Sequence, residues 1–232
     1  MRKLLSGVDT SLLEHANEIL SYDKRFSRCS FDLDIQGQVA HVTGTVSHND
    51  DQFMIRKALS RLKGIYAIWD MITVNGQSPP VIFDIGCGNQ KQYSNFIGID
   101  RFPCDGVDIV ADLERPLPVR DDAADHVFAI HVLEHIHHLI ELMNELHRII
   151  KLNGVLHLMV PRAQSDNAVG DPTHVRFFNK KTVAFFCRQA ARINPFKPLC
   201  VSEDNATIYA DLTPVKNGQP LLDEKEFAYY FE

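Results

Sequence analysis

A buried strand, a glycine turn and a second strand that ends in an acid follow one another within one short segment, "VIFDIGCGNQKQYSNFIGID" (81–100). Short apolar runs of this kind are typical of parallel strands that are buried on both faces. Glycine after such a strand lets the backbone turn sharply and approach a ligand, because it has no Cβ atom. Asp100, at the end of the second strand, can accept two hydrogen bonds from a ribose diol. The segment therefore predicts a nucleoside-binding site.

Two phosphate-binding motifs are absent from the sequence. The dinucleotide fingerprint G-x-G-x-x-G is broken after Gly88, because Asn89, Gln90 and Lys91 follow. The phosphate loop G-x-x-x-x-G-K-[ST] does not occur either. A nucleoside cofactor without a pyrophosphate is therefore expected.

The segment from residue 77 to the end alternates apolar strands with helices. This alternation predicts an α/β fold with a doubly wound parallel sheet, in which ligands bind beyond the carboxyl ends of the strands. A helix within 179–193 and two closing strands within 198–212 are expected near the end. The earlier strands are expected at residues 81–85, 95–100, 107–110, 126–132 and 155–160, with a long helix before the last of them.

The turn signal Asn75-Gly76 and the pair Pro79-Pro80 mark a boundary that divides the chain into domains 1–76 and 77–232. In the first domain, the spacing of apolar residues predicts the order α-β-β-α-β. The elements are expected near residues 12–20, 30–35, 39–46, 50–62 and 65–74.

Residues 8–75 resemble a BON domain, a small α/β module. The resemblance rests on Gly37 in the hairpin, Gly44 inside the second strand, and the segment from Gly64 to Val74. BON modules are linked to phospholipid or protein binding, so the resemblance implies a docking domain with a protein or lipid partner. Docking or dimerisation without chemistry is the favoured interpretation.

Residues 81–187 resemble the class I S-adenosylmethionine-dependent methyltransferases, in particular the type 11 branch. The motif "DIGCG" (84–88) is similar to the methionine-side loop of that family, and Asp100 matches the acid that holds the ribose hydroxyls. The stretch "VADLERPLPVRDDAADHVFAIHVLEHI" is similar to the part that flanks the adenine and follows the fourth strand. The stretch "HRIIKLNGVLHLMVP" is similar to the helix, glycine turn and fifth strand.

The resemblance implies a seven-stranded, mostly parallel Rossmann-like sheet, S-adenosyl-L-methionine as the cofactor, and a small molecule or peptide as the methyl acceptor. Two features depart from the family pattern. Gln90 replaces the third glycine of the loop, and the segment between the first two strands leaves room only for an abbreviated or irregular helix. The cofactor-binding residues that the resemblance implies are Asp84, Gly86, Cys87, Gly88, Asp100, Asp112, Leu113 and His131.

The stretch "HVLEHIHH" (131–138) contains H-x-x-E-H, a zinc-peptidase signature. A zinc hydrolase that uses His131, Glu134 and His135 is therefore an alternative interpretation. That chemistry needs both histidines on one helix, whereas His131 closes an apolar strand. We expect no metal site, and we expect Glu134 and His135 to fix the strand-to-helix turn by hydrogen bonds.

A polar loop, "GDPTHVRFFN" (170–179), follows the fifth strand, where this fold places substrate-facing segments. His174 is the first candidate for a general base and His131 the second, because histidine most often transfers protons near neutral pH. Capping of a turn by Asp171 and Thr173 is the alternative interpretation of this loop. A cofactor-binding protein that acts only by docking is the alternative to an enzyme. The side chains expected to converge over the cofactor are Asp171, Thr173, His174 and Arg176.

The amino-acid composition indicates which classes of partner and which cellular compartment to expect. The net charge of −6 argues against a nucleic acid as the main partner, because phosphate binding relies on concentrated Lys and Arg. The five cysteines form no C-x-x-C pair, which fits a reducing cytoplasm. The sequence has no run of 18 apolar residues and no apolar core of a signal peptide near its start. A soluble cytoplasmic protein without a transmembrane segment is therefore expected, and its oligomeric state is left open.

Overall fold

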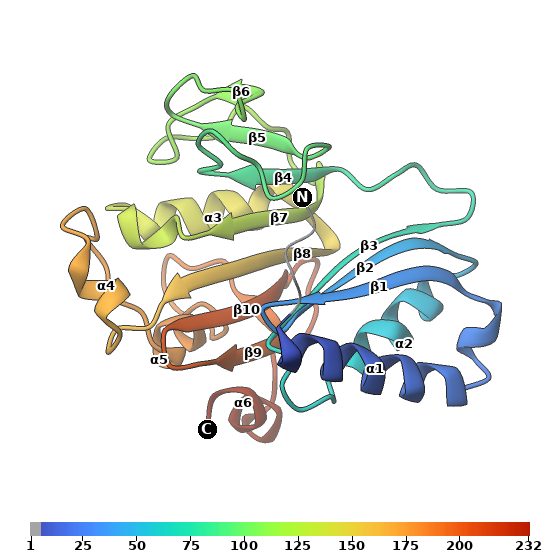
Figure 1. Ribbon diagram of the computed structural model, residues 1–232. Helices are drawn as coiled ribbons and strands as arrows, with labels where there is room; N and C mark the ends of the chain where they lie inside the picture. Colours follow the sequence, from blue (N-terminus) through green and yellow to red (C-terminus); the bar gives the residue numbers. More distant parts are fainter. Residues whose placement is uncertain (1–5) are drawn as a thin grey trace. The chain divides into compact units, whose positions relative to one another are not determined.

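The computed structural model describes residues 6–232 and divides into two compact units, Met1–Pro80 and Val81–Glu232 (Figure 1). The division falls at the Pro-Pro stretch. The expectation about a signal peptide concerns the start of the chain, and its first five residues lie outside the described part. Within residues 6–232, no helix combines the length and the apolar character that crossing a membrane requires.

The first unit has the element order that the apolar spacing predicted. Its helices are α1 (Gly7–Tyr22), the 3₁₀ helix η1 (Phe26–Arg28) and α2 (Asn49–Leu59). Its strands β1 (Ser30–Gln36), β2 (Val39–Val46) and β3 (Ala67–Val74) form one sheet in that order, antiparallel between β1 and β2 and parallel between β2 and β3. The two α-helices and one face of the sheet share a single apolar core.

Local contacts explain how α1 is fixed in this unit. Ser6 caps the helix by accepting a hydrogen bond from the N–H of Asp9, 3.1 Å away. The carboxylate of Asp9 in turn accepts the N–H groups of Gly37 and Gln38 in the β1–β2 turn, at 3.1 and 2.9 Å. A buried charge at the helix start thus ties α1 to the hairpin.

The second unit contains a seven-stranded sheet in the order β6-β5-β4-β7-β8-β10-β9. All its strands run parallel except β10, which is antiparallel to both of its neighbours. The predicted mostly parallel seven-stranded sheet is therefore confirmed. The strand order reverses between β4 and β7, and such switch points are where open α/β sheets bind ligands. The strands are β4 (Ile82–Ile85), β5 (Ile97–Asp100), β6 (Ile109–Val110), β7 (Ala124–Ile130), β8 (Ile150–Pro161), β9 (Phe196–Glu203) and β10 (Thr207–Pro214).

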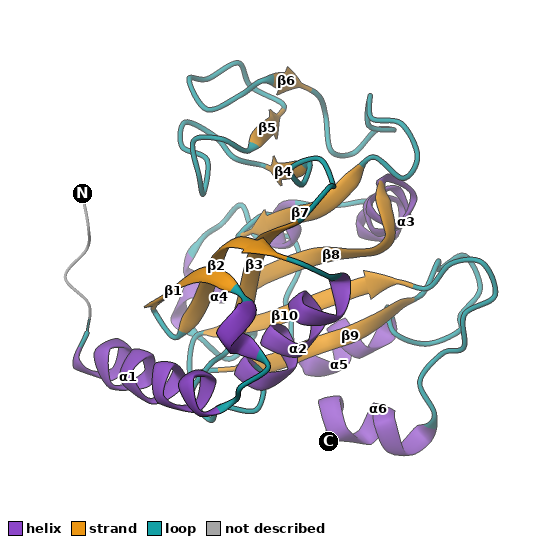
Figure 2. Cartoon of the chain, turned by 90° about the vertical axis from the view of Figure 1, so that its right-hand side faces the viewer, coloured by secondary structure: helices purple, strands orange, loops and turns teal. Residues whose placement is uncertain are grey.

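The helices of this unit are fewer than the alternating pattern predicted. Loops and turns alone connect β4 to β5, β5 to β6, and β6 to β7, as Figure 2 shows. The segment between the first two strands therefore holds no helix at all. The helical elements all follow β7: η2 (Leu133–His135), α3 (Leu139–Ile149), α4 (Asp166–Gly170), α5 (Lys180–Phe185) and α6 (Glu224–Phe231).

Three predicted boundaries are wrong for physical reasons. The strand β7 ends at Ile130, because His131 adopts a left-handed backbone with φ of 55°. The strand β8 begins at Ile150, directly after α3, so the expected glycine turn at 153–154 lies inside the strand, beside a register shift against β7. The helix expected across 179–193 ends at Phe185, and a left-handed residue, Arg192, follows in the connection to β9.

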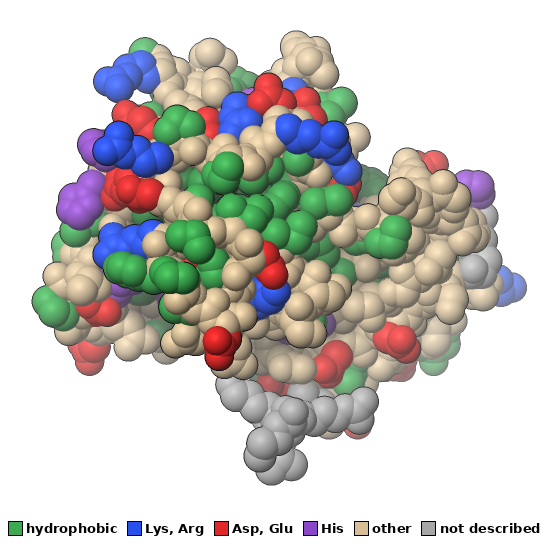
Figure 3. Space-filling view, turned by 90° about the horizontal axis from the view of Figure 1, so that it is seen from above, with side chains coloured by type: hydrophobic (Ala, Val, Ile, Leu, Met, Phe, Trp, Pro, Cys, Tyr) green, Lys and Arg blue, Asp and Glu red, His purple; other side chains and the backbone are tan. Residues whose placement is uncertain are grey.

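The core of the second unit lies between the sheet and the helices that follow β7. The helix α3 buries Leu142, Met143, Leu146 and Ile149 in it. On the side of β5 and β6, where no helix covers the chain, Phe102 and Val110 are each 58% exposed. Figure 3, which views the molecule from above, shows apolar side chains gathered at the surface among charged ones.

Candidate functional site

The glycine turn after β4 approaches the segment that follows β7. Gly86 has a φ of 64°, and its N–H donates to the carbonyl of Ile99 at 2.7 Å. A Cβ atom on Gly86 would lie 2.5 Å from a methyl group of Val132, so no other residue fits this position without displacement. The turn therefore brings the predicted cofactor loop against the residue next to His131.

Asp100 connects the glycine turn to the end of β5. One of its carboxylate oxygens accepts the N–H of Gly88 at 2.9 Å, and the other accepts the N–H of Phe102 at 3.1 Å. An ionised carboxylate has about four acceptor sites, so two remain for ligand hydroxyls. The half-buried carboxylate thus fits the predicted contact to a ribose diol.

Asp84 lies buried at the end of β4, and its carboxylate accepts the N–H of Gln92 at 2.6 Å. Burial raises the pKa of Asp84 to about 6, although the hydrogen bond from Gln92 and the charge of Lys91 act in the opposite direction. Burial, together with the charges of Asp84 and Asp100, raises the pKa of Cys87 to about 11. Cys87 is therefore a neutral thiol near pH 7, suited to packing in the loop and not to nucleophilic attack.

The two neighbouring residues that were predicted to flank an adenine differ in exposure. Asp112 is exposed after β6, and its carboxylate accepts the N–H of Glu114 at 3.0 Å. The side chain of Leu113 is buried in the apolar core. Of this pair, Asp112 is the one whose side chain a ligand can reach.

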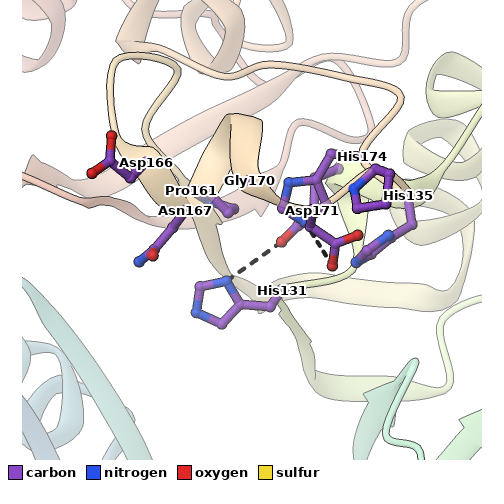
Figure 4. Close-up of a pocket in the computed structure, with 10 residues that line it drawn as sticks. His131, His135, Pro161, Asp166, Asn167, Gly170, Asp171 and His174 are labelled. Carbon is purple, nitrogen blue, oxygen red and sulfur yellow. Dashed lines mark ion pairs between the residues drawn. The ribbon is translucent and has the colours of Figure 1, made fainter.

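An open pocket of about 680 Å³ lies at the carboxyl ends of β7 and β8 (Figure 4). Figure 4 shows His135, His174 and Asp171 gathered on one side of it, and Asp166 and Asn167 on the other. The side chain of His131 is half exposed. The residues that line the pocket are His131, Glu134, His135, Pro161, Asp166, Asn167, Gly170, Asp171, Pro172 and His174.

His174 is held in a defined orientation. Its side chain is only 7% exposed, and its Nδ1 lies 2.8 Å from the carbonyl oxygen of Ala168. A carbonyl oxygen only accepts, so Nδ1 carries the proton and Nε2 keeps its lone pair in the neutral ring. Nε2 lies 3.9 Å from the carboxylate of Asp171. The geometry therefore leaves one basic nitrogen on His174.

The predicted convergence of four side chains in the polar loop holds only in part. Asp171 accepts both the N–H and the hydroxyl of Thr173, at 2.8 and 2.6 Å, and these bonds lower the pKa of Asp171. Arg176 does not converge with them: its guanidinium donates to the carbonyls of Ile136 and His137. Arg176 therefore fixes the loop to the segment after η2.

Glu134 differs from its predicted role. Its carboxylate is buried, and neither oxygen has a hydrogen-bond partner, so it does not fix the turn by hydrogen bonds. Nδ1 of His131 lies 3.4 Å from one of these oxygens. The backbone carbonyl of Glu134 accepts the N–H groups of Val175 and Arg176, which draws the polar loop over η2. The backbone of Glu134 thus anchors the polar loop, whereas its side chain does not make the hydrogen bonds that were predicted for it.

Asp166 and Asn167 line the pocket, although neither was predicted as a site residue. Both belong to α4, a short helix that begins five residues after β8 ends. Their position beyond the carboxyl end of a parallel strand is the signal that could have identified them.

A family model described as a methyltransferase domain matches residues 55–191, more than half of the chain. In structure, the chain is similar to the PH0226 protein from Pyrococcus horikoshii OT3, with 14% identity, a TM-score of 0.47, and coverage of 61% of this chain and 84% of that one. It is also similar to a SAM-dependent methyltransferase from Aquifex aeolicus, with 15% identity, a TM-score of 0.44, and coverage of 58% and 82%. Both structural similarities are weak. No curated protein matches the chain.

Proposed function

Because the chain belongs to the methyltransferase-domain family, we propose that it transfers a methyl group to a small molecule or peptide bound in the pocket beside His131. Its cofactor is S-adenosylmethionine, whose sulfonium supplies an activated methyl group. The observation that carries the proposal is the contact between Gly86 and Val132. Val132 is the chain neighbour of His131, which lines the pocket. This proximity supports the proposal that cofactor and acceptor meet there.

We assign the cofactor-binding residues the roles that the resemblance implies. In this proposal Gly86, Cys87 and Gly88 present backbone to the methionine end, with Asp84 holding the following segment through Gln92. Asp100 offers its two remaining acceptor sites to the ribose.

The adenine end belongs to the turn after β6. There the exposed Asp112 is the side chain that faces a ligand, and Leu113 contributes packing beneath it.

Positioning of the acceptor against the methyl group supplies much of the acceleration. For a hydroxyl or a protonated nitrogen, a base is also needed, and His174 and His131 are the two candidates that line the pocket. His174 offers Nε2, because Nδ1 is occupied by Ala168. The polar lining favours an enzyme over a protein that only binds the cofactor and docks.

The experiment that tests this function uses methyl-labelled cofactor with metabolite and peptide extracts. We expect one class of labelled product that requires the protein, identified by mass spectrometry. Tight cofactor binding without any labelled product, across extracts from several growth conditions, would instead favour the docking alternative.

Asp100→Ala should weaken S-adenosylmethionine binding by about 1–3 kcal/mol, or roughly 5- to 150-fold. The reason is the loss of a charged hydrogen-bond acceptor for the ribose. Isothermal titration calorimetry measures the change, and Asp105→Ala, an exposed acid in the neighbouring loop, is the matched control. An unchanged affinity for the Asp100 variant would remove the ribose assignment.

We further propose that the first unit is a BON-like docking module for a protein or lipid and contributes nothing to the cofactor site. A fragment of residues 77–232 should then fold and bind S-adenosylmethionine with the affinity of the full chain. Calorimetry on the two proteins makes the comparison. The family match begins at residue 55, inside α2, so a folded fragment that fails to bind would assign part of the site to the first unit.

A further inference from the structure

We propose that Glu134, His135 and His174 bind a divalent transition-metal ion, such as Zn²⁺, at the wall of the pocket. Each residue offers one donor atom, and the three donor atoms lie within 4.8 Å of one another. Two histidines and one carboxylate form a donor set that zinc uses in catalytic sites, where a fourth position stays open.

The state of Glu134 is the first argument for an ion. Its carboxylate is 2% exposed and lines the pocket, and neither oxygen has a hydrogen-bond partner. A buried carboxylate without donors is strongly disfavoured unless a cation or a hydrogen-bond partner compensates it. The imidazole of His131 lies near one oxygen, yet it is half exposed and does not complete a hydrogen bond. A divalent ion between Glu134 and the two histidines provides the missing charge.

The tautomers of the two histidines are the second argument. Nδ1 of His135 lies 3.3 Å from the carbonyl of Thr173 and 3.1 Å from its hydroxyl. That hydroxyl donates to Asp171, so Nδ1 of His135 is the donor, as Nδ1 of His174 is toward Ala168. Metal-binding histidines commonly donate their other ring N–H to a backbone carbonyl or a carboxylate in this way. Both rings therefore keep a lone pair on Nε2 for an ion.

The fold explains why these three residues meet although the zinc-peptidase signature does not apply. Glu134 and His135 lie in a 3₁₀ helix, and His131 precedes it, so the signature histidines do not share an α-helix. The polar loop instead supplies His174, whose ring centroid lies 4.8 Å from that of His135. The third ligand comes from a segment about 40 residues away in sequence.

The open position of the ion would face the pocket. Only the next step rests on the proposed function. The oxygen or nitrogen atom of the methyl acceptor would bind the ion at this open position. The ion would lower the pKa of that group. His174 would then act as a ligand, and the half-exposed His131 would be left to accept the proton.

The test is a Zn²⁺ titration of the full chain after chelator treatment, with a chromophoric chelator as competitor. We expect one tight site per chain and at least a tenfold loss of affinity in Glu134→Gln, His135→Ala and His174→Ala. The control is His138→Ala, an exposed histidine of the same segment. Co²⁺ substitution should give visible d–d bands without a thiolate charge-transfer band, which separates this site from binding by cysteines.

Binding of S-adenosylhomocysteine is measured on the same samples, and circular dichroism shows that each variant is folded. Glu134→Gln keeps the side-chain volume, so a loss of zinc in a folded variant reports on the ligand itself. Absence of a stoichiometric site in the wild type, or equal affinity in the three ligand variants and the control, would overturn the metal site. Such a result leaves the cofactor site intact if S-adenosylhomocysteine still binds, so the two proposals fail separately.

Discussion

His174→Ala is expected to lower kcat for methyl transfer by about 10²–10⁴-fold, the usual contribution of a general base. Affinity for S-adenosylmethionine should stay nearly unchanged, because the proposed cofactor contacts, Gly86 and Asp100, lie at the ends of other strands. A reaction with methyl-labelled cofactor under single-turnover conditions measures the rate, and calorimetry measures the affinity.

Two further measurements tell a base from a metal ligand at this position. A base acts without metal, so the chelated wild type should keep its rate while His174→Ala loses it. A ligand acts through the ion, so chelation should slow the wild type as much as the substitution does, and Zn²⁺ should restore the wild type only. His174→Asn retains a hydrogen-bond donor for the carbonyl of Ala168, which tests whether orientation of the loop alone is enough.

The exposed His138 again provides the control, because His138→Ala changes a histidine of the same segment outside the pocket lining. Normal turnover by both His174 variants would make this residue part of the loop scaffold. His131, which lines the same pocket, would then become the residue to replace.

The sheet could be predicted because its signals are local. Short apolar runs at residues 81–85 and 95–100 indicate buried parallel strands without knowledge of the rest of the chain. Gly86 and Gly88 likewise predict a turn, and both residues have left-handed backbone conformations in the structure. The connections between β4, β5, β6 and β7 could not be predicted in the same way. The alternating pattern predicts helices there, and this chain has only loops and turns.

The environment of Glu134 could not be predicted, because it depends on a segment far away in sequence. Nothing near residues 131–138 shows that the N–H groups of Val175 and Arg176 bind the backbone of Glu134. The guanidinium of Arg176 adds two bonds to the same segment, and together these contacts hold the polar loop against η2. The sequence predicted hydrogen bonds from the Glu134 side chain to the turn, and the tertiary structure leaves both of its oxygens without a hydrogen-bond partner.

Asp84 gives the clearest expected dependence of stability on pH. Its pKa is raised from 3.8 to about 6 by burial, so the folded state binds a proton that the unfolded state has released over this interval. The free energy of unfolding therefore falls as pH rises from about 4 to about 6, in total by about 3 kcal/mol from this residue. Below this window both states are protonated, and above it both are ionised, so the contribution is constant outside it.

Asp84→Asn should remove this dependence, because asparagine keeps the acceptor for the N–H of Gln92 and carries no charge at any pH. Urea unfolding followed by circular dichroism between pH 4 and pH 7 measures it. The only tryptophan, Trp69, belongs to the first unit, so its fluorescence would report on that unit instead. Asp105→Asn, at an exposed site, should keep the wild-type slope. If Asp84→Asn also keeps that slope, the charge on Asp84 is compensated within the loop, and Lys91 is the cation to replace next.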